Sequence, residues 1–316
     1  MSRPRVLITG GLGYLGGRLV QALSGRDYSV IGTSRRVRAA PEAWPSGADL
    51  RVLDPMGAPE ALAEALKGVD VIVHLAAANE IDSARDPEQA MIDTGFGTRR
   101  LLEAAITVKV RRFLFLSTIH VYGAPLTGAL DEARAPRPAH PYAVSHRLGE
   151  DFVLAAHQAG RIEGVVARLS NGIGAPAWTE VDRWSLIGND LARQIASQGR
   201  IVLKTPGLQW RDFITLTDFC AGIGCLIDAP AARLGDGLFN LGGQLPLRII
   251  DVAQAMAQAA QAVTGRAPAI ERPMSDDPGE PIAFVFPTGR IEALGFAPTG
   301  ALHLPAELLA SIRLCQ

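Results

Sequence analysis

Short apolar runs alternate along the first half of the chain with longer stretches in which apolar residues recur at helical spacing. Each run has the length and composition of a buried strand. Strands that alternate with helices predict a parallel sheet covered on both faces, because parallel neighbours need crossover connections. We therefore predict an α/β fold, a doubly wound parallel sheet, with strands near residues 5–9, 28–33, 50–53, 70–75, 112–117 and 164–169.

The pattern changes after about residue 170. Glycine, proline and tryptophan break the alternation between Gly172 and Trp178, before a helix predicted over 184–198. We predict a nucleotide-binding domain over 1–170, to which part of 211–250 returns, and a smaller substrate-binding lobe formed mainly by 171–316. Segments rich in proline and glycine recur in this second part, at 204–207, 273–281 and 298–300.

A glycine-rich turn follows the first predicted strand and precedes a helix. Its glycines are three residues apart, at 10, 13 and 16. Such a turn lets backbone N–H groups approach a pyrophosphate, and the positive end of the helix dipole favours the anion. A tight strand-to-helix turn without a ligand is the alternative. We expect a dinucleotide to contact Gly10, Leu12, Gly13, Tyr14, Leu15 and Gly16.

Composition excludes several classes of protein. The 316 residues are 48% hydrophobic and 20% charged, as in a globular protein, and the net charge of -1 predicts no attraction to nucleic acid or anionic membranes. The chain enters a strand directly and has no apolar run of about 20 residues, so we expect a cytoplasmic protein without a membrane span. We expect no metal site, and interpret Cys220, Cys225 and Cys315 as core thiols.

Several motifs together resemble the extended short-chain dehydrogenase/reductases that act on nucleotide sugars. The resemblance covers most of the chain and implies a Rossmann domain, a nucleotide-diphosphate sugar substrate and a homodimer formed by helices near 88–106 and 142–159. The residues that carry it are the turn from Thr9 to Gly16, Asp54, His74-Leu75-Ala76-Ala77, Ser117-Thr118, Val121-Tyr122-Gly123, Tyr142, the segment from Arg168 to Pro176, and Arg211-Asp212-Phe213.

The resemblance implies that Tyr142 is the catalytic acid/base and that Thr118 holds the reacting oxygen. Hydride transfer between a sugar carbon and nicotinamide needs a proton to move on the adjacent oxygen, which suits a phenol and a hydroxyl. The family reads Tyr-x-x-x-Lys, whereas this chain has His146 in place of the lysine. Residues four apart share a helix face, so His146 should still face the phenol and the cofactor ribose.

His146 changes what that position does. Lysine stays charged near neutrality, but an unperturbed histidine titrates near 6.5 and is shorter. Three interpretations remain open: a working variant, a cofactor-binding protein that has lost turnover, and a site adapted to less demanding acid/base chemistry. Thr94, where the family usually has asparagine, is a second departure that puts catalytic efficiency in doubt.

Cofactor choice is predicted from the end of the second strand. An acidic residue there would accept the ribose hydroxyls of NAD, but the chain has Ser34, Arg35 and Arg36. Two guanidinium groups suit the 2′-phosphate, so we expect NADP to be preferred and NAD to be possible, with a solvated basic loop as the alternative. The resemblance assigns further cofactor contacts to Asp54, Leu75, Ala76, Ala77, Tyr142 and His146.

The resemblance places substrate contacts at Thr118, Asn171 and Arg211. Dehydration is not expected, because 4,6-dehydratases carry an acid directly after the catalytic threonine, where this chain has Ile119 and then His120. A keto-sugar reductase and a C4 epimerase remain, with His120 either an extra proton donor or a polar loop residue. A sensor or scaffold that binds NAD(P) is the alternative. Further candidates are Trp178, Trp184 and Trp210, which stack on a base or fill the core, and Arg290 as a phosphate contact.

Overall fold

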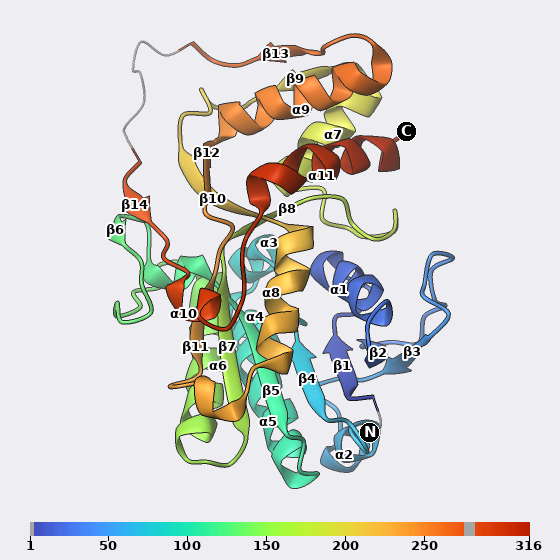
Figure 1. The fold of residues 1–316 in the computed structure, drawn as a ribbon, viewed down its shortest axis with the longest axis vertical. Coiled ribbons are helices and arrows are strands. Elements are labelled where there is room, and N and C mark those ends of the chain that lie inside the picture. Colours follow the sequence, from blue (N-terminus) through green and yellow to red (C-terminus); the bar gives the residue numbers. More distant parts are fainter. Residues whose placement is uncertain (1–2, 275–281) are drawn as a thin grey trace.

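A seven-stranded sheet forms the centre of the larger part of the molecule (Figure 1). The computed structural model describes residues 3–274 and 282–316. All neighbouring strands of this sheet pair in parallel, in the order β11-β7-β5-β4-β1-β2-β3. This confirms the predicted doubly wound α/β fold. The strands are β1 Arg5–Thr9, β2 Ser29–Ser34, β3 Ala48–Val52, β4 Val71–His74, β5 Arg112–Thr118, β7 Glu163–Leu169 and β11 Leu238–Leu241.

Helices cover both faces of the sheet. Leu19 and Leu23 of α1 (Tyr14–Ser24) pack with Phe219 of α8 (Leu216–Asp228) on one face. On the other face a second apolar cluster joins α2 (Pro59–Ala65), α5 (Gly97–Thr107) and α6 (Pro141–Gln158) to the strands. The sheet is therefore buried on both sides, as the continuous apolar runs predict.

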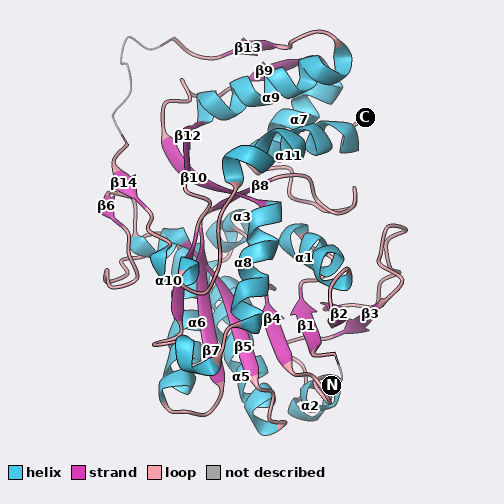
Figure 2. Ribbon diagram, viewed as in Figure 1, coloured by secondary structure: helices cyan, strands magenta, loops and turns pink. Residues whose placement is uncertain are grey.

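The second part of the chain builds a smaller lobe above the carboxyl ends of the strands (Figure 2). Its core is an apolar cluster shared by α7 (Ile187–Gln198), α9 (Ile249–Thr264) and α11 (Gly300–Leu314). A three-stranded sheet orders its strands β12-β10-β8, and two small sheets pair β13 with β9 and β14 with β6. These strands are β6 Gly128–Ala129, β8 Asn171–Ile173, β9 Arg200–Val202, β10 Trp210–Thr215, β12 Leu245–Arg248, β13 Ala269–Glu271 and β14 Phe284–Val285.

The helix expected over 88–106 is not continuous. It consists of α4 (Pro87–Ala90), a π-helical turn, η1 (Met91–Phe96), and α5. The helix expected from residue 184 begins at Ile187. Of the proline-rich segment at 273–281, residues 275–281 lie outside the described residues. The remaining short elements are α3 Glu80–Arg85, α10 Gly289–Glu292, η2 Ile119–Tyr122 and η3 Ala231–Arg233.

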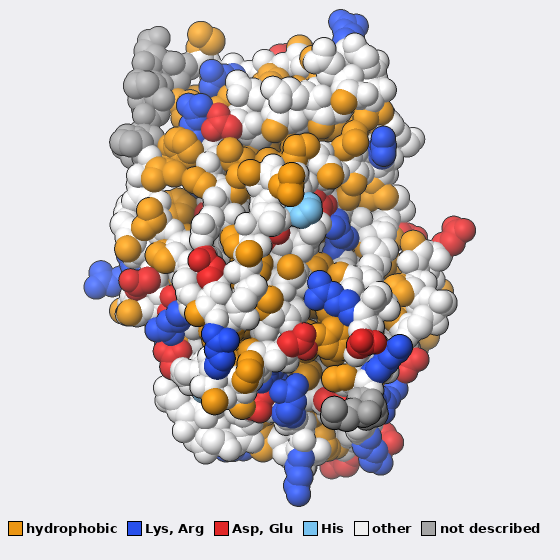
Figure 3. All heavy atoms as spheres, in the orientation of Figure 1, with side chains coloured by type: hydrophobic (Ala, Val, Ile, Leu, Met, Phe, Trp, Pro, Cys, Tyr) orange, Lys and Arg blue, Asp and Glu red, His pale blue; other side chains and the backbone are white. Residues whose placement is uncertain are grey.

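Charged groups of both signs are mixed on the face shown in Figure 3. Lysine and arginine side chains are scattered there among aspartate and glutamate. Within residues 3–274 and 282–316, no helix has the length and apolar character needed to cross a bilayer.

Candidate functional site

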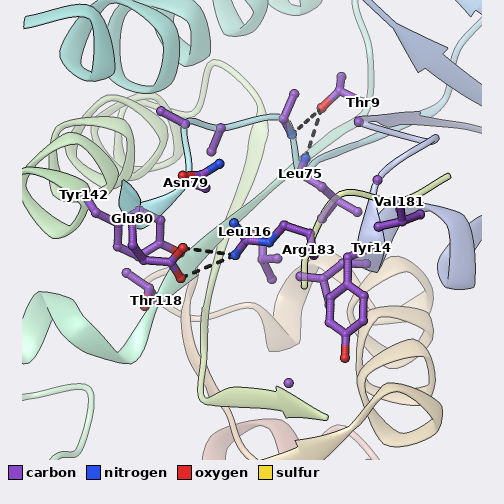
Figure 4. Close-up of a pocket in the computed structure, with 18 of the residues that line it drawn as sticks. Thr9, Tyr14, Leu75, Asn79, Glu80, Leu116, Thr118, Tyr142, Val181 and Arg183 are labelled. Carbon is purple, nitrogen blue, oxygen red and sulfur yellow. Dashed lines mark hydrogen bonds and ion pairs between the residues drawn. The ribbon is translucent and has the colours of Figure 1, made fainter. Parts of the chain in front are cut away.

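A cavity of about 1280 Å³ lies between the carboxyl ends of the strands and the smaller lobe. Loops after β1, β2, β4, β5 and β7 meet there, which is where parallel sheets bind ligands. Figure 4 shows part of its lining. The cavity brings together the residues that the sequence analysis assigned to catalysis, cofactor and substrate: Gly10, Leu12, Gly13, Tyr14, Leu15, Gly16, Ser34, Arg35, Arg36, Asp54, Leu75, Ala76, Ala77, Thr118, Tyr142, His146, Asn171 and Arg211.

The glycine turn leaves its backbone open to the cavity. Gly10 has a φ of 67°, a conformation that side chains rarely adopt. A Cβ at Gly16 would lie 2.1 Å from the Gly10 carbonyl oxygen, so no other residue fits without moving the backbone. In the described chain no side chain caps the N terminus of α1, and its first turn has no acidic residue. The turn therefore fits an anionic group at the helix N terminus.

Thr9 fastens the turn to the loop after β4. Its hydroxyl accepts hydrogen bonds from the backbone N–H groups of Leu75, at 3.0 Å, and Ala76, at 3.1 Å. The same hydroxyl donates to Nδ1 of His74 at 2.7 Å. Burial lowers the pKa of His74 to about 3, so this ring is neutral and serves as an acceptor. Two walls of the cavity are thus held at a fixed separation.

Tyr142 lies in the first turn of α6, and its side chain faces Thr118 at the end of β5 (Figure 4). Burial raises the pKa of the phenol above its usual value, the nearby Glu80 carboxylate raises it further, and Arg183 and the Thr118 hydroxyl act in the opposite direction. The phenol is therefore protonated at neutral pH. It holds the proton that an acid would donate, and it can accept one only when a ligand or cofactor lowers its pKa.

His146 lies one turn further along α6 and contacts the ring of Tyr142. The two ring centroids are 4.2 Å apart. Nδ1 of His146 is 2.8 Å from the carbonyl oxygen of Tyr142, so this nitrogen carries the proton and donates it. Burial lowers the pKa of His146 to about 4, and the side chain is therefore uncharged near neutrality. It does not supply the positive field that a lysine would.

Glu80 and Arg183 form an ion pair across the cavity that the sequence analysis missed. Nη2 of Arg183 is 3.1 Å from a carboxylate oxygen of Glu80. Figure 4 shows the carboxylate between Tyr142 and Arg183, with Thr118 nearby. Burial favours the neutral acid, but Arg183 outweighs burial and the pKa of Glu80 is lowered. Glu80 follows the motif at 74–77 closely, a signal that could have found it, whereas Arg183 lies in an irregular loop without a pattern.

His120 also lines the cavity near the phenol. Its ring centroid is 6.5 Å from that of Tyr142, in an edge-on arrangement. Burial lowers its pKa, with a contribution from the positive charge of Arg211. His120 is thus a neutral ring within reach of the same space.

The opposite end of the cavity carries the basic residues that follow β2. Ser34, Arg35, Arg36 and Arg38 line it. Arg35 pairs with Asp93 of η1, whose carboxylate was not expected at this site. The lining also includes Asp54, Pro55, Met56 and Ile92, and the Asp54 side chain accepts a hydrogen bond from the backbone N–H of Met56.

Asn171 and Arg211 lie on the neighbouring strands β8 and β10 of the smaller lobe's sheet. The Asn171 amide donates to the carbonyl oxygen of Asp212 at 2.8 Å, and Arg211 donates to the carbonyl oxygen of Trp210. Burial lowers the pKa of Arg211, which remains a cation facing the cavity. Both residues can contact a ligand that enters from this side.

Other candidates lie elsewhere or play a structural part. Trp178 is 5% exposed, packs against Tyr14 and donates to the carbonyl oxygen of Leu12, so it fills the core. Arg290 is not part of the cavity lining and pairs with Asp236 at 2.7 Å, and its role as a phosphate contact stays a prediction. Thr94 is buried and accepts a hydrogen bond from the backbone N–H of Ala78, which fixes the loop after β4.

Comparison with known proteins gives relatives with two reactions. A dTDP-glucose 4,6-dehydratase of Streptomyces niveus is 28% identical over 309 residues, which cover 93% of this chain and 88% of the relative. A UDP-glucose 4-epimerase of Rhizobium leguminosarum bv. trifolii is 29% identical over 192 residues, which cover 58% of this chain and 57% of the relative.

Solved structures share the fold over nearly the whole chain. A UDP-N-acetylglucosamine 4-epimerase from Methanobrevibacter ruminantium M1, in complex with UDP-N-acetylmuramic acid, has a TM-score of 0.82 at 21% identity and covers 99% of this chain and 98% of its own. The complex of the Thermus thermophilus UDP-glucose 4-epimerase with NAD has a TM-score of 0.80 at 24% identity, covering 98% of each chain. Residues 6–242 match one sequence family, and the chain belongs to the NAD dependent epimerase/dehydratase family.

Proposed function

We propose that the protein is an NAD(P)-dependent oxidoreductase that acts on a nucleotide-diphosphate sugar, as a keto-sugar reductase or a C4 epimerase. One observation carries the proposal. Tyr142 and Thr118 meet at one end of a cavity whose other side is the uncapped glycine turn. A dinucleotide held by the turn and a sugar held near Asn171 and Arg211 would meet beside the phenol.

The residues present fit a dinucleotide. A Cβ at Gly16 would clash with Gly10, and the open backbone of Gly10, Leu12 and Gly13 suits a pyrophosphate. Leu75, Ala76 and Ala77 would line the middle of the cofactor, and Asp54 would contact the adenine. When bound, the nicotinamide ring supplies hydride transfer to or from the sugar carbon.

Tyr142 and Thr118 would handle the proton on the reacting oxygen. The raised pKa keeps the phenol protonated at neutral pH, so the proton that reduction of a keto sugar consumes is already on Tyr142. Oxidation of a hydroxyl requires phenolate, which the neutral His146 does little to stabilise. His146 would position the phenol and contact the cofactor ribose.

Dehydration remains unexpected although dehydratases are among the relatives. Ile119, directly after Thr118, is 1% exposed and has no acid to offer. Glu80 brings a carboxylate near the phenol, but its lowered pKa keeps it ionised beside Arg183. A carboxylate held in this form is a poor donor for a leaving hydroxyl.

We propose that NADP is preferred over NAD. Arg36 and Arg38 line the cavity beside Arg35 and form no ion pair with any other described residue. Guanidinium groups bind phosphate through charge-assisted hydrogen bonds. The solved epimerase from Thermus thermophilus contains NAD, so a direct comparison of the two cofactors is needed.

We also propose a homodimer formed by α5 and α6. Phe96, at the end of η1, is 42% exposed and Val144 of α6 is 40% exposed, and the ring centroids of Phe96 and Phe152 are 6.5 Å apart. Exposed apolar groups on adjacent helices are typical of a subunit interface. The division at about residue 170 is likewise a proposal, with β11 in the large sheet supporting a return of the chain to the first domain.

The alternative is an NAD(P)-binding sensor with lost or weak turnover, which the uncharged His146 favours. Fluorescence titration with NADPH and NADH, each alone and in the presence of UDP, dTDP or GDP, tests the enzyme and the sensor hypotheses. A ternary complex strengthened by one nucleotide supports the enzyme. Cofactor binding that ignores every nucleotide favours the sensor, and no cofactor binding contradicts both.

A further inference from the structure

We propose that Asp93 sets the choice between NAD and NADP by holding Arg35 across the adenosine end of the cavity. The inference rests on the proposed cofactor site. Asp93 lies in the π-helical turn η1, on a segment remote in sequence from the basic residues after β2. Asp93 thus adds a carboxylate that determines cofactor specificity to a site where the neighbouring sequence, Arg35 and Arg36, is basic.

The pair connects two walls of the cavity. Nη1 of Arg35 is 3.1 Å from Oδ2 of Asp93, and both residues line the cavity together with Ser34. The other carboxylate oxygen, Oδ1, accepts a hydrogen bond from the Gln89 amide at 2.8 Å. Gln89, one turn earlier in the same segment, therefore orients the Asp93 carboxylate without help from Arg35.

The two cofactors impose different demands on this pair. A ribose 2′-hydroxyl is neutral and leaves the ion pair intact. A 2′-phosphate carries negative charge and competes with Asp93 for the guanidinium of Arg35. Arg36 and Arg38 remain to attract it. Asp93 thus limits a preference for NADP that the arginines would otherwise make stronger.

The expected effect is moderate because the pair is partly in solvent. The Arg35 side chain is 64% exposed and that of Asp93 is 24% exposed, so salt screens the interaction. Removing the carboxylate should raise the ratio of the NADH Kd to the NADPH Kd by about five- to tenfold at low salt, and by less at high salt.

The test measures both dissociation constants by fluorescence titration for Asp93→Asn, Arg35→Gln and the double variant. Glu88→Gln is the matched control, since Glu88 is exposed on α4, lies outside the cavity and loses the same charge. We expect the ratio to rise in Asp93→Asn and to change less than about twofold in Glu88→Gln. In the Arg35→Gln background, Asp93→Asn should change the ratio of the two dissociation constants by less than about twofold, because the ion pair is already absent.

Three results overturn the inference. They are an equal effect of Asp93→Asn and Glu88→Gln, an Asp93→Asn effect that persists without Arg35, and a fall in the ratio. Asp93→Glu keeps the charge and should retain the wild-type ratio to within about threefold. If Asp93→Asn does not fold, the comparison of Arg35→Gln with the wild type still measures the contribution of the pair. Failure of the wild type to bind either dinucleotide would contradict the proposed function itself, a result distinct from an unchanged ratio.

Discussion

His146 stands where the resemblance implies a lysine, and its proposed role can be tested by placing lysine there. In His146→Lys a cation beside Tyr142 should lower the pKa of the phenol, because a nearby positive charge favours phenolate. We expect turnover to be retained or increased above neutral pH and the rising limb of the kcat/KM profile to move to lower pH. The pH profile with NADP⁺ and a responding nucleotide sugar measures this. An unchanged profile would show that position 146 does not act on the phenol.

The buried histidines also make stability depend on pH. Burial lowers the pKa of His74 to about 3 and of His146 to about 4, against 6.5 when exposed. Between these values the unfolded chain binds protons that the folded chain does not. The free energy of unfolding is thus highest above about pH 6.5 and falls as pH falls, by about 1.4 kcal/mol per unit for each histidine.

Urea unfolding between about pH 4.5 and 7.5 checks this dependence. His146→Gln should reduce the slope and leave the part due to His74 and His120, whose pKa values burial also lowers. His303→Gln is the control, since that half-exposed ring lies on α11 away from the site. If His146→Gln and the wild type lose stability in parallel, the ring at position 146 is not held neutral by burial.

Local motifs could be read from the sequence, whereas long-range partners could not. The glycine turn, Thr118 and Tyr142 follow strand ends or begin a helix, and their spacing carries the signal. Glu80 and Arg183 are 103 residues apart, and only the fold brings them together. Arg35 and Asp93 likewise join elements 58 residues apart. The sequence therefore identified the arginines after β2 but not the carboxylate that pairs with one of them.

At the scale of elements, Arg112 joins β5 to the end of α8. It is fully buried and donates to the carbonyl oxygens of Leu226, Ile227 and Ala229 at 2.6 to 2.8 Å, while pairing with Glu163 at 2.7 Å. These carbonyls are at the C terminus of the helix, where no further backbone N–H reaches them. One guanidinium thus ties the helix to the sheet.

Arg112→Met should lower the free energy of unfolding by about 3–5 kcal/mol, because it leaves buried carbonyls and a carboxylate without their partner. Arg111→Met is the control: Arg111 pairs with the same Glu163 at 3.0 Å but is 45% exposed, so its loss should cost less than about 1 kcal/mol. Urea unfolding measures both. Similar losses in the two variants would mean that the capped carbonyls contribute little.

The elements were predictable where burial imposes a clear pattern. Central strands such as β1 and β5 agree with the predicted ranges to within a residue, because both faces are apolar. The edge strand β3 is shifted by two residues at its start, since its half-buried sequence alternates weakly. The π-helical turn η1 has no compositional signal. It places Thr94 against the loop after β4 and Asp93 against Arg35.

At the scale of the whole molecule, a buried ion pair holds the two halves together beside the cavity. Arg18 of α1 donates to both carboxylate oxygens of Glu307 on α11, at 2.8 and 2.6 Å, and to the carbonyl oxygen of Ala175. Glu307 also accepts from the hydroxyl of Thr217. Nearby, the Tyr14 hydroxyl donates to the carbonyl oxygen of Gly174. The helix that begins at the glycine turn is thus fixed directly to the smaller lobe.

Glu307→Ala should therefore weaken both stability and the coupling between halves. Glu307 is 4% exposed, and its loss leaves Arg18 without its carboxylate, at a cost of about 3–5 kcal/mol in the free energy of unfolding. Glu103→Ala breaks a similar bidentate pair with Arg161 that is nearly half exposed, and should cost less than about 1 kcal/mol. Urea unfolding followed by tryptophan fluorescence and by circular dichroism compares the two variants.

The two unfolding transitions that coincide in the wild type should separate in Glu307→Ala, because the ion pair no longer couples the unfolding of the two lobes. Coincident transitions with a loss no larger than that of Glu103→Ala would show that the apolar contacts alone join the halves.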